Sequence, residues 1–134
     1  MAIEYAGLAA AAATFSGVWF GHVAVRRIEF AAPSLGMPII LFALLGLFSE
    51  GLALASPAFS ASALFGILGA TFLYDVIEFR RQERRVLEGR ARANPLNPRH
   101  RAAIEAGKAI LEDPLARDPP EPVYASRKAP EARP

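Results

Sequence analysis

The sequence predicts an all-α membrane protein with three transmembrane helices, the N-terminus outside, and a cytoplasmic helical extension with a Pro-rich tail. Charge divides the chain: residues 1–79 carry seven charged side chains, whereas the chain from Arg80 onward carries 21. Arginines follow the first and the last apolar stretch, a pattern typical of segments kept in the cytoplasm. We therefore expect a membrane domain at 1–79, a basic helical extension at 80–113, and an extended or disordered tail at 114–134.

The first apolar stretch covers residues 3–25 and ends at Arg26 and Arg27. At about 1.5 Å per residue, a helix of this length crosses a hydrocarbon core about 30 Å thick. A cleaved signal peptide is the competing interpretation, but a basic start and a small-residue cleavage site are both missing. The stretch is therefore predicted to be a permanent membrane span.

The second apolar stretch covers residues 37–79, which is too long for one span. Pro57 and the serines around it predict a turn, which leaves spans at 37–55 and 59–79. Arginines on both sides of this hairpin require an even number of crossings between them, and two crossings fit. The expected connections are a cytoplasmic loop of about 12 residues and a short outer turn.

Small residues predict how the spans pack, because close approach in lipid depends on Gly, Ala, Ser and Thr. The first and third spans are expected to be in contact. The candidate packing residues are Gly7, Gly17, Gly21, Ser62, Gly66 and Ala70. Small residues are also common in membrane helices without such a role. Large aromatic residues are expected to face lipid or a partner: Trp19, Phe20, Phe42, Phe48, Phe65 and Phe72.

Four polar residues within or beside the spans are candidate sites, because ionisable groups in lipid are costly: His22, Glu50, Asp75 and Glu78. Glu50 is interpreted either as a protonated or snorkelling carboxylate or as a site for a proton, an ion or a partner's base. His22 and Asp75 lie at similar depth, so a hydrogen bond between them is expected if their spans are neighbours, with a proton relay as the alternative. Glu78 has the helical spacing to pair with Arg81 or Gln82.

The arginines beside the spans are predicted to fix the topology and to attract anionic lipid headgroups. They are Arg26, Arg27, Arg80, Arg81, Arg84 and Arg85. Nucleic-acid binding is not expected, because no aromatic residues accompany them.

Beyond the spans, the third helix is expected to continue through residues 80–93. A further helix is predicted up to residue 113, with Asn97 as its N-cap and Pro98 at its first position. His100 is expected at the surface.

Residues 21–30 ("GHVAVRRIEF"), the apolar hairpin and residues 78–99 together resemble the bacterial family named domain of unknown function 4491. The shared positions are His22, Arg27, Glu29, Phe30, Glu78, Gln82, Glu83, Arg84 or Arg85, Gly89, Asn97 and Pro98. Val23 stands where the family has proline, an aromatic pair after Gly89 is absent, and the chain from His100 is additional. The resemblance implies three spans and no assigned activity.

The sequence contains no Ser/His/Asp set, no phosphate-binding glycine loop, no metal-ligand cluster and no cysteine. We therefore expect a non-enzymatic accessory or scaffolding subunit of a larger complex in the bacterial inner membrane. One alternative is a homo-oligomeric transport or proton-conducting protein that uses Glu50. Another is a subunit that holds haem or chlorophyll through His22, although the sequence requires no cofactor.

Overall fold

The computed structural model describes residues 5–112, so the tail predicted at 114–134 lies outside it. Three long helices, α1 (Tyr5–Ala31), α2 (Gly36–Ala55) and α3 (Phe59–Leu87), are followed by a short 3₁₀ turn, η1 (Pro98–His100), and by α4 (Arg101–Glu105). Each long helix is long and apolar enough to cross a membrane. The predicted all-helical fold with three candidate spans is confirmed.

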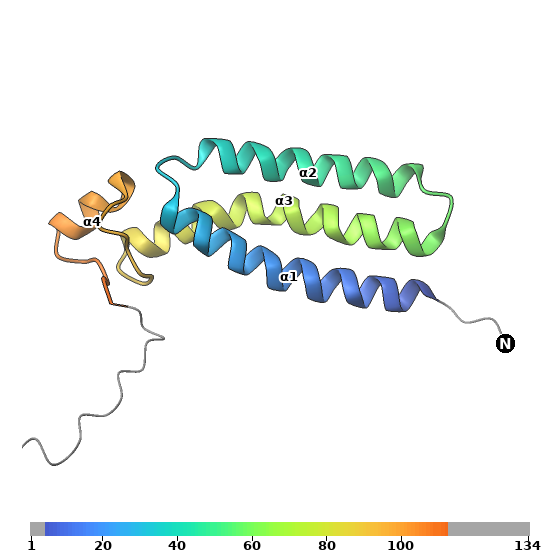
Figure 1. Cartoon of the computed structure of the whole chain (residues 1–134), viewed down its shortest axis with the longest axis horizontal. Coiled ribbons are helices and arrows are strands. Elements are labelled where there is room, and N and C mark those ends of the chain that lie inside the picture. The colour runs from blue at the N-terminus through green and yellow to red at the C-terminus, as the bar shows by residue number, and fades with distance from the viewer. Residues whose placement is uncertain (1–4, 113–134) are drawn as a thin grey trace, which may run out of the picture.

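The three long helices lie side by side with α3 in the middle (Figure 1). Helix α3 contacts both α1 and α2. The predicted contact between the first and third spans is therefore present, and the second span packs on α3 as well. Residues after α3 fold back at the end of the bundle where α1 ends and α2 begins, and we call this the cap end.

Helices α1 and α3 extend further than the apolar stretches that predicted them, which ended at residues 25 and 79. Helix α1 continues past Arg26 to Ala31, so the predicted loop of about 12 residues is wrong and the connection is only residues 32–35. The helix stops there because a residue before proline disfavours the helical conformation, and Ala32 precedes Pro33. The change in hydropathy at Arg26 predicts the membrane boundary, whereas Pro33 determines where the helix ends.

Most large apolar side chains of the bundle face outward, as expected for helices surrounded by lipid. Leu54 is 89% exposed and Phe15 is 74% exposed. Phe42, predicted to face lipid or a partner, is instead only 7% exposed. Its ring packs edge-on against Phe72 and Phe79, with centroids 5.8 and 5.1 Å away. This aromatic contact joins α2 to α3 near the cap end.

Glycines set the distance between α3 and its two neighbours. On α1, Cβ atoms added at Gly17 and Gly21 would lie 3.2 Å from Thr71 Oγ1 and 2.5 Å from Asp75 Oδ2. Gly66, expected to face the first span, instead lies 3.7 Å from Ala53 of α2 by the same measure. Because α3 has a neighbour on each side, its small residues are divided between two contacts.

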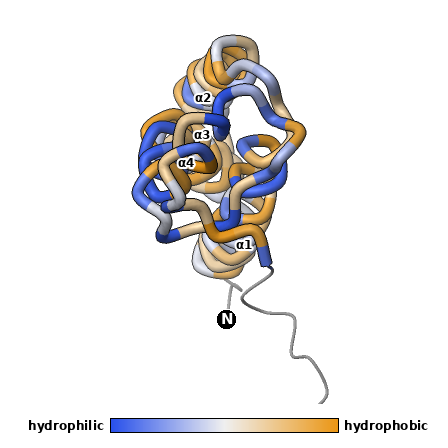
Figure 2. Tube along the Cα trace, turned by 90° about the vertical axis from the view of Figure 1, so that its left-hand side faces the viewer, coloured by the Kyte–Doolittle hydropathy of each residue, from blue (hydrophilic) through white to orange (hydrophobic). Residues whose placement is uncertain are grey.

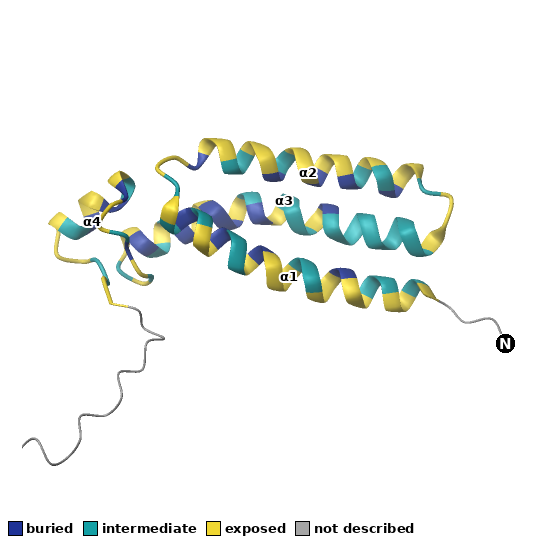
Figure 3. Cartoon of the chain, viewed as in Figure 1, coloured by how far each residue is buried: buried dark blue, intermediate teal, exposed yellow. Residues whose placement is uncertain are grey.

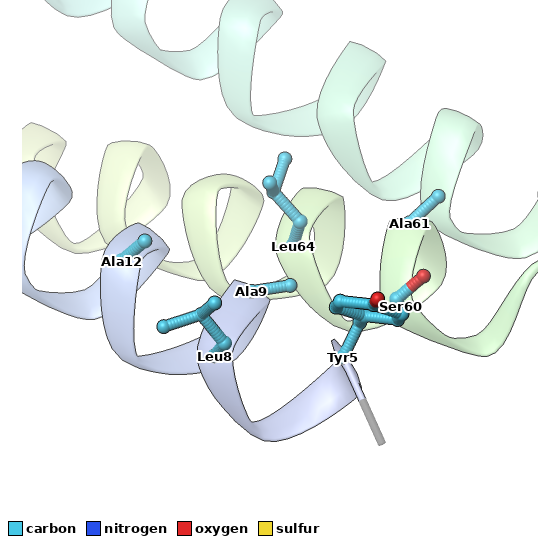
Figure 4. A pocket seen from close by; sticks show the side chains of 7 residues that line it. All are labelled: Tyr5, Leu8, Ala9, Ala12, Ser60, Ala61 and Leu64. Atoms are coloured by element: carbon cyan, nitrogen blue, oxygen red, sulfur yellow. The ribbon is translucent and has the colours of Figure 1, made fainter. Parts of the chain in front are cut away.

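Of the remaining candidate packing residues, Gly7 and Ala70 lie away from the helix contacts. Nothing lies within 4 Å of a Cβ added at Gly7, Ala70 is exposed, and Ser62 is half-buried. Near the start of α1, a pocket of about 330 Å³ separates α1 from α3 (Figure 4). It is lined by Tyr5, Leu8, Ala9, Ala12, Ser60, Ala61 and Leu64. Close packing of α1 on α3 therefore lies beyond this pocket, at Gly17 and Gly21.

We expect Gly46→Ala to destabilise the α2–α3 contact by about 1–3 kcal/mol, the usual cost of overpacking. A Cβ at this position would lie 2.7 Å from Leu73 Cγ and 3.1 Å from the Gly69 carbonyl oxygen. Gly51→Ala is the matched control, because nothing lies within 4 Å of its added Cβ. Reversible unfolding in mixed micelles measures both variants. Equal stability of the two would show that α2 does not pack on α3 through Gly46.

Candidate functional site

The segment after α3, residues 88–112, folds back against the bundle, and we call it the cap. The turn into the cap is a Schellman motif: the Gly89 amide donates to the Val86 carbonyl (3.0 Å) and the Arg90 amide to the Arg85 carbonyl (2.7 Å). Gly89 has φ +70°, a conformation that glycine adopts without steric cost. The predicted continuation of the helix through residue 93 is therefore wrong, because Gly89 reverses the chain.

A second Schellman motif shortens the other predicted helix. Helix α4 ends at Glu105, not at residue 113, because Gly107 takes φ +66° and the Lys108 amide donates to the Ala103 carbonyl (3.0 Å). The chain then returns beside residues 92–93, where Arg92 and Ile110 form an isolated β-bridge. The Ala93 amide donates to the Ile110 carbonyl (2.7 Å), which closes the cap on itself.

Two asparagines of the cap satisfy the carbonyl groups that the end of α1 leaves free. Asn94 Nδ2 donates to the Phe30 carbonyl (3.0 Å). Asn97 Nδ2 lies within donor distance of the Glu29, Phe30 and Ala32 carbonyls, at 3.3, 3.1 and 3.0 Å. Asn97 Oδ1 also accepts the Arg99 amide (3.1 Å), so the predicted N-cap role is confirmed. The Asn97 side chain thus caps both the C-terminal end of α1 and the N-terminal end of η1.

Beside these asparagines lies a buried ion pair between α1 and the cap. Glu29 is 1% exposed, and its Oε1 accepts from Arg99 Nη2 (2.6 Å) and from His100 Nε2 (2.9 Å). Arg99 also donates to the Glu29 carbonyl (2.9 Å) and reaches Glu83 of α3 at 3.4 Å. The guanidinium therefore joins α1, α3 and the cap.

The hydrogen bonds of His100 determine which ring nitrogen carries the proton. The Asn94 amide donates to Nδ1 (2.8 Å), so Nδ1 must be the unprotonated nitrogen. The hydrogen then lies on Nε2, which donates it to Glu29. The ring therefore links the Asn94 amide of the cap to the Glu29 carboxylate of α1.

We call this group the polar cluster; it consists of Glu29, Glu83, Asn94, Asn97, Arg99 and His100. His100 is 0% exposed, so the expectation that it lies at the surface is wrong. The largest fully buried side chains gather at this end of the molecule (Figure 3), and the cap carries much of the hydrophilic sequence (Figure 2). Because its members bond to each other and to backbone groups of α1, the cluster holds the cap against the bundle.

We expect Asn97→Asp to loosen the cap at least as much as Asn97→Ala. Aspartate keeps the oxygen that accepts the Arg99 amide but loses the donors to three carbonyls and faces them with a carboxylate. Loss of the N-cap alone costs about 1 kcal/mol. The Phe30 and Glu29 carbonyls keep their other donors, Asn94 and Arg99. The Ala32 carbonyl is left without a side-chain donor, which adds about 1–3 kcal/mol. Amide hydrogen exchange of residues 90–112 measures the effect; near-native protection in Asn97→Asp would mean that only the capping oxygen matters.

Within the spans, the structure separates the polar residues that the sequence singled out. Asp75 is 3% exposed and its Oδ2 has no hydrogen-bond partner, whereas the ring of His22 is exposed, so the expected bond between them is not formed. The carboxylate of Glu50 lies against α3, where a Cβ on Gly69 would be 2.7 Å from Oε1. Glu78 pairs with Arg81 (3.6 Å), as expected from its spacing, and also with Arg85.

The basic residues differ in how far they are engaged. Arg26, Arg27 and Arg84 are exposed. Arg80 pairs with Glu83 at 3.6 Å, and Arg81 donates to the Tyr74 hydroxyl at 2.5 Å and lies over its ring. The exposed arginines on α1 and α3 lie toward the cap end of the bundle.

Sequence reasoning missed Glu29, Arg99 and His100 as one unit, because about 70 residues separate the partners. The signal that was available is the resemblance, which singled out Glu29 and Asn97 at opposite ends of its pattern. Among residues 5–112, no group of three or more His, Asp or Glu side chains is arranged to hold a metal ion.

The sequence model of a protein family described as Domain of unknown function (DUF4491) matches residues 4–99. This range contains all three long helices and ends within η1 of the cap. Neither the comparison with curated proteins nor the comparison with solved structures gives a match.

Proposed function

The chain belongs to the family described as Domain of unknown function (DUF4491), and we propose that it is a non-enzymatic accessory or scaffolding subunit of a larger membrane complex. In this proposal the three helices anchor the chain in the bacterial inner membrane. The N-terminus is outside and the cap lies at the cytoplasmic surface, where other subunits bind it. Exposed arginines toward the cap end support this orientation through the positive-inside rule.

One observation carries the proposal: the hydrogen bonds of the polar cluster hold the cap against α1. Burying Glu29 and Arg99 is costly unless both are paired, and the structure pairs them. In the cluster, the carboxylate and the imidazole face protein donors and acceptors. Such an arrangement supports a shaped surface for recognition better than it supports chemistry on a substrate.

The cap also presents apolar surface to a partner. Leu96 is 92% exposed, and it lies in a turn held by Asn94, whose Oδ1 accepts the Leu96 amide at 2.9 Å. Leu111 is 47% exposed. A leucine held in a rigid turn loses little conformational entropy on binding.

Isolation of the full chain from native membranes in mild detergent tests the proposal, with native mass spectrometry as the readout. We expect a defined complex of this chain with other membrane proteins and anionic lipid. A homo-oligomer would overturn the proposal and favour transport through Glu50. A bound pigment lost in His22→Ala would overturn it in favour of a cofactor-holding subunit.

A further inference from the structure

Asp75 lies where α3 meets α1, and its carboxyl group has no role in the polar cluster or in the ion pairs described above. The residue is 3% exposed, and a Cβ added at Gly21 would lie 2.5 Å from its Oδ2 and 2.9 Å from its Oδ1. Both carboxyl oxygens therefore face the backbone of α1. Oδ2 is buried without a hydrogen-bond partner.

No cation is bonded to this carboxyl group among the residues that the structure describes. From α1, His22 is within electrostatic range, but its ring is exposed. The one ionisable residue of α2 is Glu50, which lies against Gly69. On α3 itself, Glu78 is one turn away and is occupied with Arg81 and Arg85.

The backbone of α1 favours a neutral acid at this position. In the middle of a helix each N–H is already donated within the helix, whereas each carbonyl oxygen keeps a second lone pair. The surface at Gly21 thus offers acceptors and no donors. A carboxylate gains nothing there, whereas a neutral carboxylic acid can donate its hydrogen, and an unpaired ion in apolar surroundings is costly.

We propose that Asp75 is a proton-binding site and that its occupancy controls the contact between α1 and α3. The protonated acid lies against Gly21 and keeps the helices together. Loss of the proton leaves a carboxylate that needs donors, so α1 moves away to admit water or the His22 ring. The ligand of this site is a proton, because the described residues place no other bonding partner at Asp75 Oδ2.

Carbon-13 NMR of the aspartate carboxyl groups in nanodiscs tests the first half of this proposal without altering the site. The chain has aspartates only at positions 75, 113 and 118, so an Asp113→Asn/Asp118→Asn variant leaves Asp75 as the single signal. We expect the chemical shift of a neutral acid at pH 5, where an ordinary aspartate is already a carboxylate. The shift of a carboxylate at pH 5 would overturn the proposal.

Pulsed dipolar EPR tests the second half, and the absence of cysteine allows labels at any chosen positions. Labels at Trp19→Cys on α1 and Ile77→Cys on α3 report the separation of the two helices beside Gly21 and Asp75, since both residues are exposed. We expect the distance to lengthen as pH rises above the titration of Asp75 and to stay short in Asp75→Asn, which mimics the neutral acid. Glu50→Gln is the matched control and should titrate like the native chain. A distance independent of pH in the native chain would overturn the control of the contact.

Discussion

Glu29→Ala is expected to release the cap from α1, with a loss of about 3–5 kcal/mol, the cost of breaking a buried ion pair on one side. The substitution removes the acceptor of both Arg99 and His100 and leaves the guanidinium, 14% exposed, with only distant Glu83 as a counter-charge. Amide exchange of residues 88–112 should rise about 100-fold or more, since each 1.4 kcal/mol is a factor of ten. Glu29→Gln should have a smaller effect, because its amide oxygen can still accept.

Glu88→Ala is the matched control for this experiment. Glu88 lies in the cap and its carboxylate pairs with Arg90, but the two side chains are 46% and 63% exposed. Exposed pairs contribute about 0–1 kcal/mol. If Glu88→Ala and Glu29→Ala raised exchange equally, the polar cluster would not be what holds the cap.

The second large effect is expected for Gly89→Ala. Alanine is strained at φ +70°, and its Cβ would overlap the Lys108 carbonyl oxygen, which is backbone and cannot rotate away. Left-handed strain alone costs about 1–2 kcal/mol, and the overlap adds to it by forcing Gly89 and Lys108 apart. We expect loss of protection throughout residues 90–112, measured by hydrogen exchange, while the three spans remain folded.

Gly107→Ala separates the two causes. Gly107 has nearly the same φ, +66°, but nothing lies within 4 Å of its added Cβ. This variant should show only the cost of the left-handed conformation. A Gly89→Ala variant no worse than Gly107→Ala would contradict the close approach of Gly89 to Lys108.

The membrane domain was predictable because its signals are local. Pro57 divides the apolar hairpin, and α2 begins within one residue of the predicted start and ends where predicted, at residue 55. Phe42 was misplaced because hydropathy does not distinguish a side chain that faces lipid from one that packs between helices. That distinction depends on which face of α2 meets α3, and Gly46 and Ser49, both buried, indicate this face only when the partner helix is known.

The cap was harder to predict because its stability depends on contacts between distant residues. The signals at Asn97 and Pro98 correctly located the start of a helix. Nothing near Glu29 indicates that its carboxylate meets Arg99, because the pairing depends on α3 carrying the chain back to the end of α1. Gly107 was a local signal for the end of α4, and the longer helix was predicted by extending a weak apolar pattern past it.

Photo-crosslinking in native membranes tests the central claim, that the rigid cap binds another subunit. A photoreactive amino acid replaces Leu96 in the cap and, as a control, exposed Leu44 on α2. We predict that position 96 forms one defined crosslink to another membrane protein and that Glu29→Ala abolishes it, while position 44 reacts mainly with lipid. Crosslinks from position 96 to lipid alone, or a protein crosslink unchanged by Glu29→Ala, would contradict the account.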